Sequence, residues 1–332
     1  MNISLYAILI PVVFYFLIPL CGSLFVGSQW RKFRNTVFHS LGVPLLTYDK
    51  SRKIRKDNGY KFFGKLNSFS GNKSAWIKDN NLTVRIDLPH CRFYRLLPYN
   101  KDLIKDVNTK DKIKKMFQGG SEVESISGNE FRSLPEGTNV FIIGTILSDS
   151  GAVIFSGAVL NPVTVIVFEE DRKQLVPCAL WGGRQTNEIW NPVTPWSLGL
   201  GSLLSVIFVN IILRNPSFRY FLKIFFTEAL LPVLLFFPPG VVFFVLFLYF
   251  WKKIRYYKAK RDLLLLMEKC EDYTEADCSL LKSLFSEDED KKDIKIVNRK
   301  VLFNQVLSFS NLILGLVLNT FLCLIILNHF LE

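Results

Sequence analysis

The chain has 332 residues, 49% of them hydrophobic, and a formal net charge of +12. Its apolar residues are gathered into uncharged runs of about 20, long enough to cross a bilayer, which excludes a single water-soluble globular protein. Six cysteines without a C-x-x-C pair and only three histidines leave too few clustered ligands for a closed zinc site. We therefore expect a membrane protein without a metal ion or other cofactor.

The positive charge indicates contact with lipid rather than with nucleic acid. Much of the excess Lys and Arg lies directly beside the apolar runs, where it orients membrane segments and attracts anionic head groups. The predicted partners are therefore membrane lipids and no nucleic acid. The residues expected to set the topology are Arg31, Lys32, Arg34, Lys252, Lys253, Arg255 and Lys258.

The first apolar run covers residues 3–27 and is predicted to be an uncleaved transmembrane helix, since no charged segment precedes it. The basic residues follow this run, which places the N-terminus outside the membrane. Residues 28–59 are then predicted to be a basic tether on the cytoplasmic side.

Residues 60–192 are predicted to form a β-rich soluble domain. Residues 82–88 alternate apolar and polar side chains, the period of a half-buried strand. Further strands are expected at residues 60–66, 92–96, 139–147, 152–155 and 163–169, and a helix at residues 102–117. Gly64 and Gly144 fall inside strands and indicate bends, so we expect a small, barrel-like α+β domain.

Three more transmembrane helices are expected after this domain, at residues 196–213, 229–251 and 309–328. Residues 214–228 are predicted to be a short outside loop or an interfacial helix. The fold class is therefore an α-helical polytopic membrane protein with four transmembrane helices, both termini outside, and an inserted β-rich domain.

The helix over residues 229–251 contains Pro238, Pro239 and Gly240, which predict a kink within the membrane. A basic collar follows it and opens a cytoplasmic loop over residues 252–307, which carries both basic and acidic clusters and is expected to be helical.

Catalytic motifs are scarce. His90 and Cys91 are the candidate base and nucleophile of the soluble domain, but adjacent residues of a strand point to opposite faces, so we interpret both as structural. No glycine-rich phosphate-binding loop stands between a strand and a helix. Asn319, inside the last span, is expected to form a hydrogen bond with a neighbouring helix. This pattern favours a protein without enzymatic activity.

The soluble domain resembles the membrane-anchored β-rich domain found beside a RING in mitochondrial ubiquitin ligases, and alone in some prokaryotic proteins. The residues that carry the resemblance are residues 63–66 (FGKL), 134–138 (LPEGT), 140–145 (VFIIGT) and Pro162. In that family these residues belong to strands and mark no catalytic group, so the resemblance implies a fold and no activity. This chain differs from the ligases because it lacks the cysteine-histidine cluster of a RING and has two additional predicted spans.

The leading hypothesis is a non-catalytic, multi-pass protein of a bacterial inner (plasma) membrane. It presents the β-rich domain to the cytoplasm for protein binding or membrane-complex assembly, with Arg85, Arg92 and Arg95 as candidate contacts for a partner protein or lipid. Glycines within the spans also allow close helix approach and a homo-oligomer. Two alternatives stay open: a transport or channel component built around the proline kink, and a membrane-interface enzyme that acts on lipids through His90.

Overall fold

The computed structural model describes residues 3–51, 59–79, 82–97, 122–149, 152–159, 161–169, 172–188, 191–234, 238–270 and 291–331. The chain forms two compact units. The helical unit comprises Met1–Gln29, Asn187–Lys258 and Ile296–Glu332, and the barrel unit comprises Trp30–Thr186 and Ala259–Lys295. The helix predicted at residues 102–117 lies outside the described residues.

Three helices are long and apolar enough to cross a membrane, namely Ile3–Gly42, Val193–Leu213 and Ile294–His329. They indicate a membrane protein, as the sequence predicts. The first of them consists of α1 (Ile3–Ile10), the π-helical segment η1 (Pro11–Leu17), α2 (Ile18–His39) and a final 3₁₀ turn, η2 (Ser40–Gly42). Pro11 has no N–H for the helical hydrogen-bond ladder, which accounts for the wider turns that begin at this residue.

The first part of the predicted tether over residues 28–59 is helical, because α2 continues to His39. Trp30, Phe33 and Val37 recur at helical spacing and are buried. This apolar stripe lies on the part of α2 that belongs to the barrel unit, and its burial stabilises the helix beyond the apolar span. The tether also contains a short helix, α3 (Tyr48–Ser51).

The helix predicted over residues 229–251 is replaced by two helices. After α7 (Val193–Leu213), the 3₁₀ segment η6 (Pro216–Phe221) leads into α8 (Leu222–Leu234), and α9 (Gly240–Cys270) begins separately. Residues 214–228, predicted to be a short outside loop or an interfacial helix, contain η6 and the first part of α8. Pro238 and Pro239 stand directly before α9. Proline lacks the N–H group that a helix interior needs, but it is compatible with the residues that lead into a new helix.

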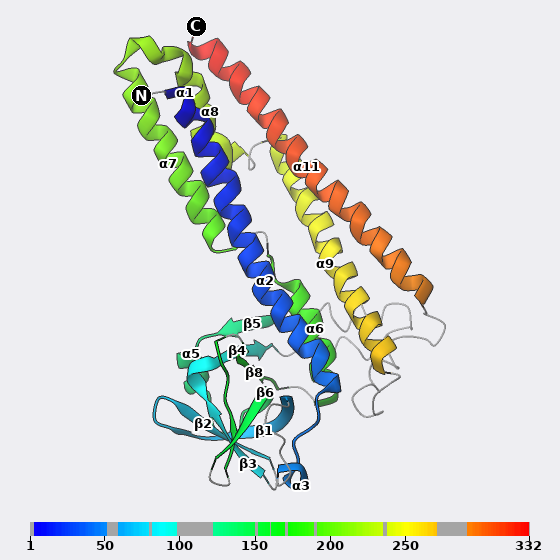
Figure 1. Ribbon diagram of the computed structural model, residues 1–332. Coiled ribbons are helices and arrows are strands. Elements are labelled where there is room, and N and C mark those ends of the chain that lie inside the picture. Colours follow the sequence, from blue (N-terminus) through cyan, green and yellow to red (C-terminus); the bar gives the residue numbers. More distant parts are fainter. Residues whose placement is uncertain are drawn as a thin grey trace. The chain divides into compact units, whose positions relative to one another are not determined.

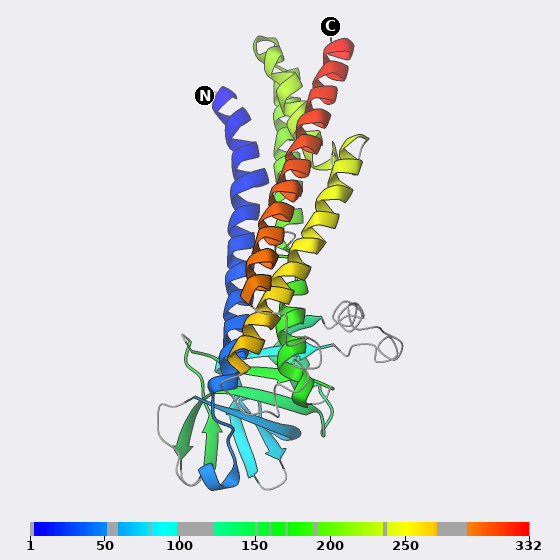
Figure 2. The same cartoon turned by 90° about the vertical axis from the view of Figure 1, so that its right-hand side faces the viewer.

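The second loop, predicted over residues 252–307, is helical at both ends within the described residues. Helix α9 passes through the basic collar to Cys270, and α11 (Lys291–Leu331) starts well before the predicted span at residues 309–328. Helices α9 and α11 lie side by side in Figures 1 and 2. A Cβ atom added at Gly315 of α11 would lie 2.9 Å from the Cβ of Phe243, so the glycine permits this close approach.

The helical unit has its own apolar cluster around α7 and α8. Phe208 stacks on Phe225 with ring centroids 5.1 Å apart and on Tyr6 at 5.3 Å. Seven residues before Phe208 on α7, a Cβ atom added at Gly201 would lie 2.5 Å from the Tyr15 ring, so this glycine lets η1 approach α7 closely.

Five strands of the barrel unit form a closed circuit: β1 (Gly59–Ser70), β2 (Ser74–Asp79), β3 (Leu82–Asp87), β7 (Ala152–Phe155) and β6 (Asn139–Asp149). Neighbours in this circuit pair antiparallel except β3 and β7, which are parallel, and β6 pairs back with β1 to close it. The result is the small β-barrel-like region visible in Figure 1. Alternate residues point inward, so that Phe62, Ile77 and Ile86 are buried in its core.

Three further strands extend the sheet beyond β6: β8 (Val163–Val167), β4 (Cys91–Leu96) and β5 (Val123–Ile126). Two helices cover this unit, the short α5 (Gly128–Arg132) and α6 (Arg172–Gln185). The sequence did not predict α6. Pro177 and two glycines lower its helix propensity, and burial of Leu175, Cys178 and Leu180 stabilises it instead.

Candidate functional site

Four arginines and one aspartate of the barrel unit surround a cavity of about 200 Å³, here called the arginine cavity. Helix α2 contributes Arg31 and Arg34, α6 contributes Arg184, and α9 contributes Arg261 and Asp262. The rest of the lining consists of Asn35, Phe38, Leu180 and Leu265.

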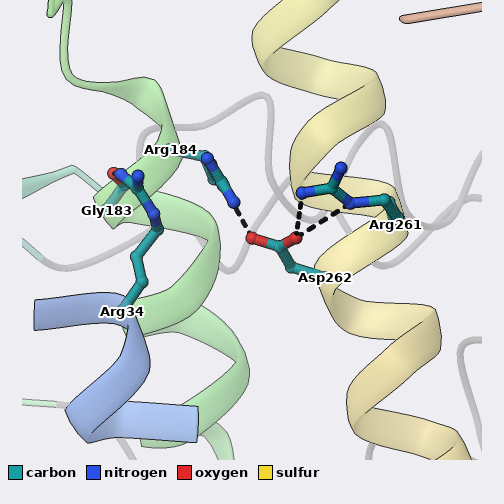
Figure 3. Close-up of polar contacts among 5 residues, drawn as sticks. All are labelled: Arg34, Gly183, Arg184, Arg261 and Asp262. Atoms are coloured by element: carbon teal, nitrogen blue, oxygen red, sulfur yellow. Dashed lines mark hydrogen bonds and ion pairs between the residues drawn. The ribbon is translucent and has the colours of Figure 1, made fainter. Parts of the chain in front are cut away.

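Asp262 lies between two arginines. Its Oδ2 accepts a hydrogen bond from Nε of Arg184 at 2.6 Å, and its Oδ1 accepts from Arg261 at 3.1 Å. Figure 3 shows Arg184 and Arg261 reaching the carboxylate from opposite sides. The side chains of Arg184 and Asp262 are 18% and 12% exposed, so this ion pair is largely removed from water. A buried pair of this kind fixes side-chain positions more surely than it adds stability.

Arg34 connects α2 with the end of α6. Its Nη1 donates a hydrogen bond to the carbonyl oxygen of Gly183 at 2.8 Å, as Figure 3 shows. Carbonyl groups in the last turn of a helix lack helical partners and carry partial negative charge, so a guanidinium is a suitable donor for them. A Cβ atom added at Gly183 would lie 3.1 Å from the ring of Phe33, which shows how closely the two helices approach.

The lining of the arginine cavity suits binding rather than catalysis. Its charged groups are guanidiniums and one carboxylate that is already ion-paired, and no serine, cysteine or histidine is among its described lining residues. Guanidinium groups recognise carboxylate and phosphate through paired N–H donors. The described lining therefore offers donor groups of the kind that recognise anions.

A second, larger cavity of about 560 Å³ lies on the barrel itself and is here called the barrel groove. It is lined by Lys65, Leu66, Asn67, Lys78, Asp79, Glu136, Gly137 and Arg172. Arg172 crosses it, since its Nη2 lies 3.0 Å from Oδ1 of Asp79 and its guanidinium lies 5.5 Å from the centre of the Phe63 ring. Both signs of charge are therefore present along one concave surface.

The structure does not bring Arg85, Arg92 and Arg95 together. Three strands separate β3, which carries Arg85, from β4. Arg92 and Arg95 are three residues apart on β4 and point to opposite faces. Arg85 pairs with Asp87 at 3.5 Å and stands opposite Trp76 of β2, whereas Arg95 stands opposite Glu124 of β5. The predicted arginine contact surface is therefore not a single patch.

The residues predicted to set the topology separate into two groups in the structure. Arg31 and Arg34 line the arginine cavity, whereas Lys32 beside them does not; Arg31 and Lys32 are both exposed and Arg34 is buried. Lys252, Lys253, Arg255 and Lys258 belong to the helical unit, where Nζ of Lys253 lies 4.4 Å from the centre of the Tyr249 ring.

The proline motif and Asn319 meet as neighbours in the structure. The Asn319 side chain of α11 accepts a hydrogen bond from the N–H of Gly240 at 3.3 Å and donates one to the carbonyl oxygen of Leu234. The prediction that Asn319 bonds to a neighbouring helix is confirmed. The predicted kink residues thus lie at a break between α8 and α9 that a third helix bridges.

Cys91 does not have the environment of a nucleophile. Its thiol donates a hydrogen bond to the carbonyl oxygen of Asp87 at 2.9 Å. Burial, with a smaller effect from the nearby Asp87 carboxylate, raises the pKa of this thiol to about 12. Since the thiolate is the reactive form, the thiol is inert near neutral pH. His90, its neighbour, is exposed at the end of a 3₁₀ turn.

Sequence reasoning did not predict that Arg184, Arg261 and Asp262 meet in one cavity. One signal was present in the sequence. The basic collar at residues 252–261 contains no carboxylate, and Asp262 follows it directly. An acidic residue placed beside such a collar indicates a local ion pair. Arg184 follows two glycines in a segment without a helical pattern, and its position became apparent only in the structure.

We compared the chain with family models, curated proteins and solved structures. None of the three comparisons found a match. The resemblance to the membrane-anchored domain of mitochondrial ubiquitin ligases therefore stays a prediction, and function is inferred from the geometry alone.

Proposed function

We propose that this protein is a non-catalytic integral membrane protein with four spans whose barrel unit binds a partner protein in the assembly of a membrane complex. The barrel groove carries this proposal. It is the larger of the two cavities described above, and its charges of both signs suit a peptide segment that carries both acidic and basic residues.

The third span of this proposal is discontinuous and is formed by α8 and the start of α9. Helix α8 has 13 residues and is too short to cross a hydrocarbon core of about 30 Å at about 1.5 Å per residue. Helix α9 begins with an apolar stretch from Gly240 to Trp251, and the two helices together supply the missing length. Asn319 binds backbone groups at both sides of the break, which is the protection that interrupted helices require in lipid.

With four spans, the basic clusters after the first and third spans lie on one side, which the positive-inside rule assigns to the cytoplasm. In this arrangement both termini are outside, and the barrel unit lies on the cytoplasmic side of a bacterial inner membrane. Partner proteins are accordingly expected in the cytoplasm or among the cytoplasmic parts of other membrane proteins.

The groove is tested by cross-linking in native membranes. A photo-reactive amino acid at Asn67 should capture a partner, and the double change Lys65→Glu with Lys78→Glu should abolish this capture by reversing two charges of the lining. Lys73→Glu is the matched control, because Lys73 is an exposed lysine in the turn at the other end of β2. Equal capture by the double variant and the wild type would contradict the proposal.

A second candidate function is transport, which one observation favours. Glu228 of α8 is 8% exposed, and the hydroxyl group of Tyr15 donates a hydrogen bond to its main-chain carbonyl at 2.6 Å. Buried carboxyl groups in membrane helices often belong to ion pathways. Uptake of a cation by proteoliposomes that Glu228→Gln abolishes would support transport, and intact uptake in that variant would remove Glu228 from it.

A further inference from the structure

The described lining of the arginine cavity holds more positive charge than its carboxylate balances. Four guanidinium groups line it, Asp262 is the acidic residue among the described lining residues, and Nζ of Lys269 lies 4.4 Å from the centre of the ring of Phe38 in the cavity wall. Like charges repel strongly where water is partly excluded, unless an anion lies between them. Asp262 serves Arg184 and Arg261, whereas Arg31 has no ion pair with any described residue.

The arginines also keep hydrogen-bond donors for a ligand. Arg184 uses its Nε for Asp262, and its two terminal nitrogens have no partner within the described ranges. Arg31 presents its whole guanidinium from the exposed edge of α2. A guanidinium offers five N–H groups in one plane, and two such groups at different angles can enclose a tetrahedral anion.

The size and the apolar wall narrow the choice of anion. A volume of about 200 Å³ accommodates several groups of the size of a water molecule, each of which occupies about 30 Å³ in the liquid. Phe38, Leu180 and Leu265 form an apolar part of the lining. In a ligand that carries a phosphate group on a carbon skeleton, the phosphate can contact the arginines and the carbon atoms can contact the apolar wall. A small carboxylate ion can contact only the arginines.

We propose that the arginine cavity binds a phosphate group, carried either by the head group of an anionic phospholipid or by a small soluble phosphate. Arg31 and Arg184 donate hydrogen bonds to the phosphate oxygens, and Arg34 and Arg261 add positive charge. Asp262 holds Arg184 and Arg261 in position. This site is distinct from the barrel groove, so the proposal does not depend on the proposed partner protein.

The test uses the full chain, purified in a neutral detergent and freed of lipid. Two probes are titrated separately by calorimetry, inorganic phosphate and a short-chain phosphatidylglycerol, with short-chain phosphatidylcholine as the zwitterionic control. We expect saturable binding of one equivalent of at least one anionic probe. Competition between the two probes shows that they share a site, binding of the lipid alone assigns the head group as the source, and binding of phosphate alone assigns a soluble ligand.

The variants assign the binding to this cavity. Arg31→Gln breaks no described ion pair, so the fold should be retained, and the affinity should fall about tenfold because one charge-assisted donor group is lost. Adding Arg184→Gln should lower it further. Lys32→Gln removes the same charge from an exposed residue of the same helix that does not line the cavity, and should change the affinity less than about twofold.

Two results would overturn the proposal. One is the absence of saturable binding for both anionic probes. The other is an equal loss of affinity in Arg31→Gln and Lys32→Gln, which would show unspecific attraction by a basic surface. Circular dichroism checks the fold of each variant, and Arg31→Gln alone decides if the double variant unfolds. Lys65→Glu with Lys78→Glu should leave phosphate binding intact, which separates this proposal from that for the groove.

Discussion

The carboxamide oxygen of Asn319 lies 3.3 Å from the backbone nitrogen of Gly240, the first residue of α9. The nitrogen of the same carboxamide donates to the carbonyl oxygen of Leu234, the last residue of α8. One side chain thus serves the free acceptor at the end of one helix and the free donor at the start of the next. In an apolar environment each of these backbone groups would be costly to leave unpaired.

We predict that Asn319→Leu destabilises the helical unit by about 2 kcal/mol or more, because two buried backbone groups lose their partner. Thermal unfolding of the full chain in detergent measures the effect. Asn311→Leu is the matched control, since among the described residues Asn311 bonds to the carbonyl of Leu307 in its own helix, at 2.7 Å. An equal shift of the melting temperature in both variants would show that the break does not depend on Asn319.

The ion pair of the arginine cavity predicts a local effect. Asp262→Asn should leave the largely buried Arg184 without its anion and destabilise the packing of α6 by about 3 kcal/mol. Hydrogen exchange of α6 amides reports this opening directly. Asp79→Asn breaks the more exposed pair with Arg172 and should cost less than about 1 kcal/mol. Unchanged exchange in Asp262→Asn would show that the pair does not hold α6.

The capping box of α5 predicts a loss of stability in acid. The backbone N–H of Ser127 donates to the Glu130 carboxylate at 2.5 Å, and this bond lowers the pKa of Glu130 from its ordinary value of 4.5. Because the pKa of Glu130 is lower in the folded state than in the unfolded state, its carboxylate stabilises the fold at every pH above the unfolded pKa of 4.5. This contribution is lost as the pH falls from 4.5 through the folded pKa.

Glu130→Gln should therefore flatten the pH dependence of the unfolding midpoint below pH 4.5 and change little at pH 7 beyond a constant offset. Melting curves of wild type and variant, recorded from pH 7 down to well below pH 4.5, test it. Glu124→Gln, an exposed change on β5, serves as the control. A wild-type slope retained in Glu130→Gln would assign the acid sensitivity to other carboxylates.

Cys91 is predicted to resist alkylation in the folded protein. With a thiol pKa of about 12, only about one molecule in ten thousand carries a thiolate at pH 8. In a variant whose single cysteine is Cys91, maleimide should therefore label this thiol far more slowly in the folded protein than in the denatured protein. Labelling at equal rates would mean that the thiol is neither buried nor bonded to Asp87.

This inertness makes Cys91 a poor reporter of topology, and an added cysteine is better. Lys73→Cys, in a chain without its own cysteines, places a thiol in the exposed turn before β2. If the barrel unit is cytoplasmic, an impermeant maleimide should label it in right-side-out vesicles only after the membrane is opened. Immediate labelling would place the unit outside and reverse the proposed topology.

The strand pattern was the most predictable part of the fold. Alternation over residues 82–88 gave β3 (Leu82–Asp87) because one face of that strand is buried in the barrel and the other is wet. Length and hydropathy likewise indicated α7. These features depend on local periodicity alone, which a sequence displays directly.

The rest depended on contacts between distant segments. The sequence predicted a kink at the two prolines and Gly240, whereas the structure has a break before α9. Asn319, 79 residues after Gly240, bonds to backbone groups on both sides of this break. Helix α6 has weak intrinsic propensity and forms through burial. The arginine cavity combines residues of α2, α6 and α9, and no spacing within one segment could indicate that these charges meet.

The closure of the barrel also constrains how the chain folds during synthesis. Strand β1 pairs with β6 in a register that joins Gly59 with Thr145 and Lys65 with Asn139. This pairing can form only after the ribosome has added about 80 more residues to the chain. At typical translation speeds of about 5–20 residues per second, that interval lasts several seconds. During this time the growing chain exposes an unpaired edge, and the cell must protect it from pairing with other chains.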